Sequence, residues 1–123
     1  MKILISNSSS ESIYEQIGTQ IKNLILKGEL KEGDPLPSIR TLAKELHISV
    51  ITTKRAYEEL ENDGFIETLR GKGSFIAPQN KELFKERKMK IIEDKLEEVV
   101  VESKSLGITL EELIEILSTL YEE

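Results

Sequence analysis

Six basic side chains in the middle of the chain are the residues best suited to chemistry, and that chemistry is the binding of phosphate. They form three pairs along the sequence: Arg40 and Lys44, Lys54 and Arg55, Arg70 and Lys72. Basic side chains grouped in this way can contact the phosphates of nucleic acid, which supply most of the affinity of DNA-binding proteins. The pattern therefore favours DNA binding over catalysis.

No group of residues has the spacing of a catalytic or metal site. His47 is the only histidine and cysteine is absent, so thiolate, disulfide and metal chemistry lack their usual residues. The run Gly71-Lys72-Gly73 lies in an expected hairpin, without the strand-to-helix setting of a nucleotide-binding loop. We expect no catalytic residues, metal or cofactor, a structural role for His47, and a protein that is not an enzyme.

Two short helices joined by a tight turn are predicted to position the first two basic pairs. Ser38 follows a proline and can cap the first helix, the pair His47-Ile48 forms the break, and Ser49 can cap the second helix. Gly64 suits the left-handed residue that ends such a helix. Helical spacing gives the second helix an inward face of Thr53, Ala56, Tyr57 and Leu60.

A small hairpin follows, and its turn carries the third basic pair. Its two short strands are expected around Ile66, Thr68, Phe75 and Ile76, and the glycines at 71 and 73 allow the turn. The order of elements predicts a mainly α fold with a small β-hairpin. This is a winged helix-turn-helix, followed by a two-helix C-terminal dimerisation tail.

The N-terminal part is expected to support the helix-turn-helix. A helix capped by Ser10 or Ser12 and closed by Gly28 has one apolar stripe of Ile13, Ile17, Ile21, Leu24 and Ile25. The less favoured use of this helix is a groove for a partner. Residues 1–5 are predicted to pair as a short strand.

After residue 78 the pattern changes to a long charged helix over about 81–104 and a last helix from Leu110, which Thr109 and Glu112 introduce as a capping box. We therefore predict a DNA-binding domain over residues 1–78 and a helical extension over 79–123. The two helices cannot bury their stripes against each other alone, so a second copy is the expected cover and packing onto their own winged domain is the alternative. The expected dimer interface is Ile91, Ile92, Leu96, Val99, Leu110, Leu113, Ile114, Leu117, Leu120 and Tyr121.

The formal charge of −6 opposes DNA binding, but its distribution weakens the objection. Residues 81–123 carry seven lysines and arginines against twelve acidic residues, a net charge of −5, which leaves −1 for the first eighty residues. No apolar run approaches the about 20 residues that span a bilayer, and the N-terminus lacks the apolar core of a signal peptide. We expect a cytoplasmic protein without membrane contact.

The ordered runs LPSIRTLAKEL, IS, TKRAYEELENDGFI and GKGSFIA resemble the DNA-binding domain of the GntR family of bacterial transcription regulators. The upstream run SIYEQIGTQIKNLILKGELKEGDPLPSIR is similar to that family's first helix, so the resemblance covers residues 10–78. The short tail resembles the YtrA-like subgroup, whose members are dimers through this tail. Many relatives have Arg or another polar residue where this chain has Val50-Ile51, which leaves the operator sequence open.

The resemblance adds roles to the residues chosen from the pattern. Arg40 and Lys54 match family positions that contact DNA, although an ion pair with Glu45 is the alternative for Arg40. Arg55 could instead brace the fold through Glu58 or Glu59, and Ile51 could pack on thymine methyl groups or tuck under the helix. The expected DNA-binding set is Arg40, Ser49, Val50, Ile51, Thr52, Lys54, Arg55, Lys72 and Gly73.

These observations predict a sequence-specific transcription regulator, expected to be a repressor, that binds double-stranded DNA as a homodimer on an inverted repeat. The resemblance adds control of a transporter operon. An unidentified small-molecule effector is a further expected partner, which could bind between tail and winged domain. The alternative is a winged-helix module for protein interaction, with the acidic tail as its binding surface and no specific DNA binding. The operator, the regulated genes and the choice between repression and activation are not encoded in any motif.

Overall fold

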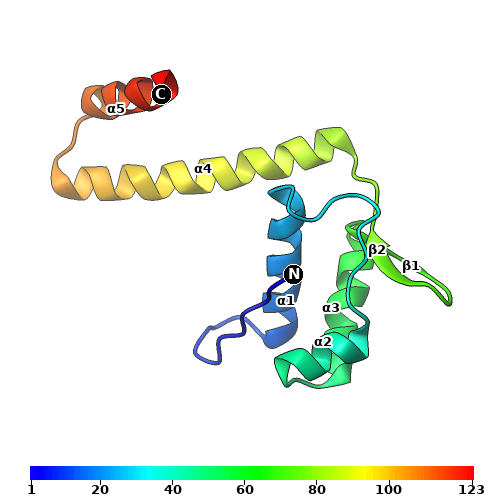
Figure 1. Ribbon diagram of the computed structural model, residues 1–123. Coiled ribbons are helices and arrows are strands. Elements are labelled where there is room, and N and C mark those ends of the chain that lie inside the picture. Colours follow the sequence, from blue (N-terminus) through cyan, green and yellow to red (C-terminus); the bar gives the residue numbers. More distant parts are fainter. The chain divides into compact units, whose positions relative to one another are not determined.

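The computed structural model describes all 123 residues and contains five helices and one two-stranded sheet (Figure 1). In chain order the elements are α1 (Ile13–Leu26), α2 (Ile39–Leu46), α3 (Val50–Asn62), β1 (Ile66–Leu69), β2 (Gly73–Ile76), α4 (Lys81–Leu106) and α5 (Leu110–Glu122). This order confirms the predicted mainly α fold with a hairpin wing after the helix-turn-helix. No helix is long and apolar enough to cross a membrane.

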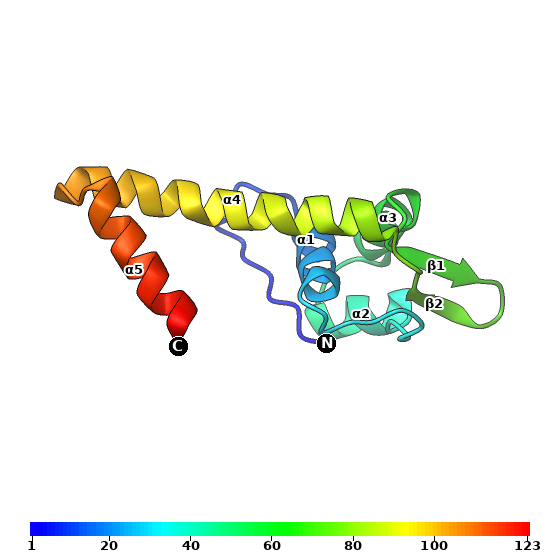
Figure 2. The ribbon, with the colours of Figure 1, turned by 90° about the horizontal axis from the view of Figure 1, so that it is seen from above.

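The chain divides into two compact units, residues 1–84 and 85–123, so the first turn of α4 belongs with the winged domain. In the first unit α1 and α2 both pack against α3, and the hairpin continues from the end of α3 (Figures 1 and 2). Burial removes apolar surface from water and is the main force that holds these elements together. The core contains Ile17, Ile21, Leu42, Ala56, Tyr57, Leu60, Phe65, Ile66 and Ile76.

Helix α1 begins at the cap Ser12, whose hydroxyl accepts from the Glu15 amide. The expected strand over residues 1–5 is wrong, because side chains of α1 hold this segment instead. The Gln20 amide accepts from the Leu4 N–H at 2.9 Å and donates to the Leu4 carbonyl at 2.7 Å, and Gln16 binds Ser6 in the same way. These glutamines satisfy the backbone groups that a neighbouring strand would otherwise pair.

Both predicted caps of the helix-turn-helix are confirmed. The Ser38 hydroxyl accepts from the Thr41 amide at 3.1 Å, and the Ser49 hydroxyl accepts from the Thr52 amide at 3.0 Å. His47 ends α2 in the left-handed conformation with φ of 56°, a rare geometry for a residue other than glycine. The sharp exit at His47 turns the chain into α3.

The wing is an antiparallel hairpin in which Ile66 pairs with Ile76 and Leu69 pairs with Gly73. Gly71 and Gly73 have φ of +78° and +101°, so the turn uses the conformations that glycine adopts without a steric penalty. Pro35 forms an isolated bridge to Phe75, which ties the segment before α2 to the wing.

The second unit contains most of α4, which ends at Leu106 rather than near residue 104, and α5, capped by Thr109 through the Glu112 amide at 3.2 Å. Ser103 is its only buried residue. Most of the predicted dimer-interface side chains are exposed; Ile91 and Leu113 are half-buried. The unit therefore has an apolar surface without an apolar core.

Candidate nucleic-acid interface

The buried face of α3 fixes which of its side chains point outward. Thr53, Ala56, Tyr57 and Leu60 are all buried, as the spacing predicted. The first turn therefore presents Val50 and Ile51, which are 46% and 81% exposed. Ile51 does not tuck under the helix, so an apolar side chain stands at the position from which a recognition helix reaches base edges.

The hydroxyls at the start of α3 are used within the helix cap. Ser49 Oγ donates to Thr52 Oγ1 at 2.8 Å and accepts from the Thr52 amide, so both side chains are held in one orientation. Ser38 and Thr41 form the same pair at the start of α2, also at 2.8 Å. The remaining free amides in the first turn of α3 can still bind an anion.

Lys54 and Arg55 are neighbours in α3 with different surroundings. Lys54 is exposed, and its only ion pair is with Glu58 at 3.8 Å, one helical turn away. Exposed pairs of this kind contribute little to stability, so the lysine can exchange Glu58 for a phosphate. Its site is compatible with the predicted DNA contact.

Arg55 is held more firmly. Its guanidinium lies 3.8 Å from the centre of the Tyr14 ring of α1, and its Nε lies 3.9 Å from the Glu59 carboxylate. The ring face attracts the cation, so Arg55 links α3 to α1. The bracing role foreseen for this residue is present and involves Glu59; its DNA contact stays a prediction.

Arg40 is exposed in the first turn of α2, and its alternative ion pair with Glu45 is not formed. Glu45 instead lies near Tyr57. Burial, and after it the Glu45 charge, raises the pKa of Tyr57, so the phenol stays protonated. The Tyr57 hydroxyl donates to the Pro37 carbonyl at 2.7 Å and anchors the segment that leads to Arg40.

Lys72 is exposed at the tip of the wing, between the two glycines of the turn. Its amide donates to the Leu69 carbonyl at 2.9 Å, which closes the turn and leaves the side chain to solvent. Figures 1 and 2 both show the hairpin extending beside α2 and α3. The structure thus places the predicted DNA-binding residues on α2, α3 and the wing of one unit.

Sequence reasoning missed three contacts that fix these elements: Tyr14 under Arg55, Tyr57 on Pro37, and the ion pair between Lys22 of α1 and Asp63 at 3.0 Å. Each joins residues far apart in the chain. Only the aromatic residues themselves, large and rare in this sequence, could have drawn attention to two of them.

The family model for the bacterial regulatory proteins of the gntR family matches residues 13–76, from the start of α1 to the end of the wing. The chain belongs to the GntR family. It is 44% identical over 113 residues to the HTH-type transcriptional repressor YtrA of Bacillus subtilis, an alignment that covers 92% of this chain and 87% of that protein. The predicted family and its YtrA-like type are confirmed.

Two solved structures extend the comparison to the fold. A transcriptional regulator from Oenococcus oeni superposes with a TM-score of 0.74 at 29% identity, over 95% of this chain and 97% of that one. The DNA-binding domain of AraR in complex with operator ORX1 gives 0.55 at 22% identity, over 63% and 96%, and shows a shared fold. The chain is a DNA-binding transcription regulator with a winged helix-turn-helix, in a family of regulators rather than enzymes.

Proposed function

We propose that this GntR-family protein is a cytoplasmic repressor that binds an inverted-repeat operator as a homodimer. Two surfaces carry the proposal: the outward face of α3 combines exposed cations and free helix-start amides, and the same chain carries an exposed apolar tail. The first surface fits DNA, and the second fits another copy of the chain.

In this proposal the DNA contacts divide into positioning and reading. Arg40, Lys54 and Lys72 bind phosphates, and the backbone at Gly73 allows close approach of the wing. Ser49 and Thr52 lie at the start of α3, where their hydroxyls or the remaining free amides of the first turn bind a phosphate. Val50 and Ile51 pack on thymine methyl groups in the major groove, since neither side chain can donate or accept a hydrogen bond.

The homodimer supplies the second half-site. The exposed apolar side chains of α4 and α5 would be covered by the same surface of a second copy, as two-fold symmetry requires. Two recognition helices related by this axis read half-sites about one helical turn apart or more. The base sequence of these half-sites has to be determined by selection experiments.

Repression follows if the operator overlaps a promoter, because the bound dimer would block polymerase. The similarity to a protein named as a transcriptional repressor supports this direction over activation. Control of a transporter operon is the physiological role that the YtrA-like resemblance suggests, and an effector would act by changing the placement of the two winged domains.

The test is selection of binding sites from a random duplex library, followed by fluorescence anisotropy on the enriched site at increasing salt. We expect an inverted repeat whose affinity falls steeply, about 1,000-fold or more between about 50 and 200 mM salt if six or more phosphates are contacted. No enriched site, with only weak binding, would support the protein-interaction alternative.

Charge reversal sharpens this test. The double variant Arg40→Glu/Lys54→Glu should abolish operator binding while the protein stays folded, because both residues are exposed. The matched control Lys2→Glu/Lys27→Glu makes the same charge change at exposed positions outside α2, α3 and the wing. If the control lost affinity equally, net charge rather than this interface would explain the binding.

A further inference from the structure

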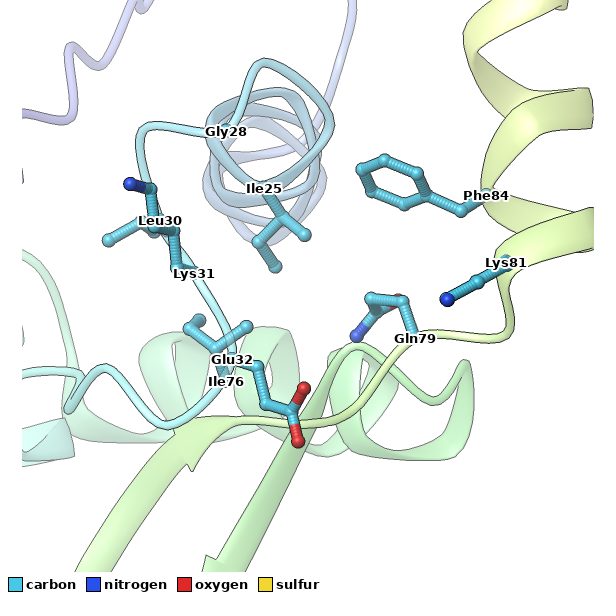
Figure 3. A pocket seen from close by; sticks show the side chains of 9 residues that line it. All are labelled: Ile25, Gly28, Leu30, Lys31, Glu32, Ile76, Gln79, Lys81 and Phe84. Atoms are coloured by element: carbon cyan, nitrogen blue, oxygen red, sulfur yellow. The ribbon is translucent and has the colours of Figure 1, made fainter.

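We propose that a cavity at the base of the wing binds a small apolar carboxylic acid that regulates operator binding. This inference rests on the proposed dimeric regulator and names the site and chemical class of its effector. The cavity has a volume of about 260 Å³ and lies within the first unit, between the end of α1, the loop after it, the end of β2 and the first turn of α4 (Figure 3).

The floor of the cavity is apolar. Figure 3 shows the Phe84 ring of α4 pointing toward Ile25 of α1, with Ile76 and Leu30 on the opposite side. Ile25 and Ile76 are almost completely buried, and Phe84 is half-buried against the same core. Because the space is slightly below the usual range of about 300–1,000 Å³ for ligand sites, it fits a single ring or a short branched chain.

The polar groups of the rim indicate an anionic head. Lys81 extends from α4 on the same side as Phe84, whereas the Lys31 side chain lies on the opposite side, with its nitrogen pointing away from Phe84. In Figure 3 the Glu32 carboxylate points away from Phe84 and Ile25. Gln79 uses its Nε2 on the Ala77 carbonyl at 2.6 Å. A carboxylate beside Lys81 would form a charge-assisted hydrogen bond.

The position of the cavity couples such a ligand to DNA binding. Lys81 and Phe84 lie in the first turn of α4, which Asn80 caps through the Leu83 amide. The rest of α4 belongs to the tail that joins two winged domains in the proposed dimer. A ligand that connects this first turn to α1 would restrain how the tail leaves the domain, and both half-sites must be reached together.

The first experiment is titration of the ¹⁵N-labelled full chain with benzoate, phenylacetate and hexanoate, each compared with its neutral amide. We expect at least one acid to shift the amide signals of Gly28, Leu30 and Phe84, and its amide to bind more weakly. Lys81→Met should weaken the acid about ten-fold, the size expected for one lost charge-assisted contact. The control Lys95→Met removes an exposed lysine of the tail and should change nothing.

The second readout is operator affinity with and without the acid that binds. The wild type should change its affinity, and Lys81→Met should respond only at higher acid concentration. No shift from any acid, or equal binding of acid and amide, would overturn the inference. Operator binding measured without ligand tests the proposed function separately, so the two failures are distinguishable.

Discussion

The two units of this protein treat their apolar side chains in opposite ways. In the winged domain Ile17, Ile21 and Leu60 have no exposed surface, whereas in the tail Leu110 and Leu120 are 66% and 58% exposed. The winged domain thus builds a core from its own elements. The sequence of the tail favours helices, but these helices have no apolar core. The tail must therefore be stabilised by packing against the surface of another part or copy of the protein.

The largest expected effect is loss of the proposed dimer. Ile114→Lys/Leu117→Lys places two charges on the exposed apolar face of α5. We expect a monomer in sedimentation velocity and an operator affinity lower by about 100-fold or more, because binding of the two half-sites is no longer linked. Circular dichroism should show that the winged domain persists.

The control for this variant uses the same helix. Glu115→Lys makes the same charge change of +2 on the opposite face of α5, where an apolar interface is not expected. It should stay dimeric. Dissociation of this control would mean that charge, rather than the apolar stripe, governs the association.

A second comparison sets a buried leucine against an exposed one. Leu60→Ala in α3 should lower the free energy of unfolding of the winged domain by about 2–5 kcal/mol, the cost of a cavity in a packed core. Leu120→Ala should leave that transition unchanged and affect only dimerisation. Urea unfolding at two protein concentrations measures both, and an equal effect of the two substitutions would remove the distinction between the units.

The two caps of the helix-turn-helix provide a smaller, paired test. Ser38→Ala and Ser49→Ala should each lower stability by about 1 kcal/mol, because each removes one hydroxyl that binds a helix-start amide. Only Ser49→Ala should also weaken operator binding beyond this loss of stability. Equal affinity of the two variants, measured by anisotropy, would argue against α3 as the recognition helix.

The smallest effect is expected from Gly18 in the middle of α1. A methyl group there would meet no atom within 4 Å, so Gly18→Ala should stabilise the winged domain by about 0.4–1 kcal/mol. Gly28→Ala should destabilise it, since Gly28 has φ of +79°. Thermal unfolding of both variants checks the prediction. A destabilised Gly18→Ala would indicate that the added methyl group clashes with another group, such as one from a second copy of the chain.

The sequence predicted the helix-turn-helix well because its signals are local. Ser38, Ser49 and Gly64 lie at the ends of the helices they define, and the buried face of α3 follows from helical spacing alone. The strand expected at residues 1–5 was wrong because its partner is not a strand but two glutamine side chains of α1. Hydrogen bonds between residues far apart in the chain leave no local pattern in the sequence.

The candidate interface was predictable only in part for the same reason. The exposure of Ile51 and Lys54 follows from the rotation of α3, but the attachment of Arg55 to Tyr14 depends on how α1 packs. The cavity at the base of the wing is formed by residues from α1, β2 and α4, so no single stretch of sequence predicts it.

The most direct test of the account is the stoichiometry of the protein on DNA. Native mass spectrometry of the full chain with the selected duplex, and with a duplex that carries only one half-site, counts the chains in each complex. We predict two chains on the inverted repeat and much weaker binding to the single half-site. One chain on each duplex, with equal affinity, would contradict the dimeric regulator.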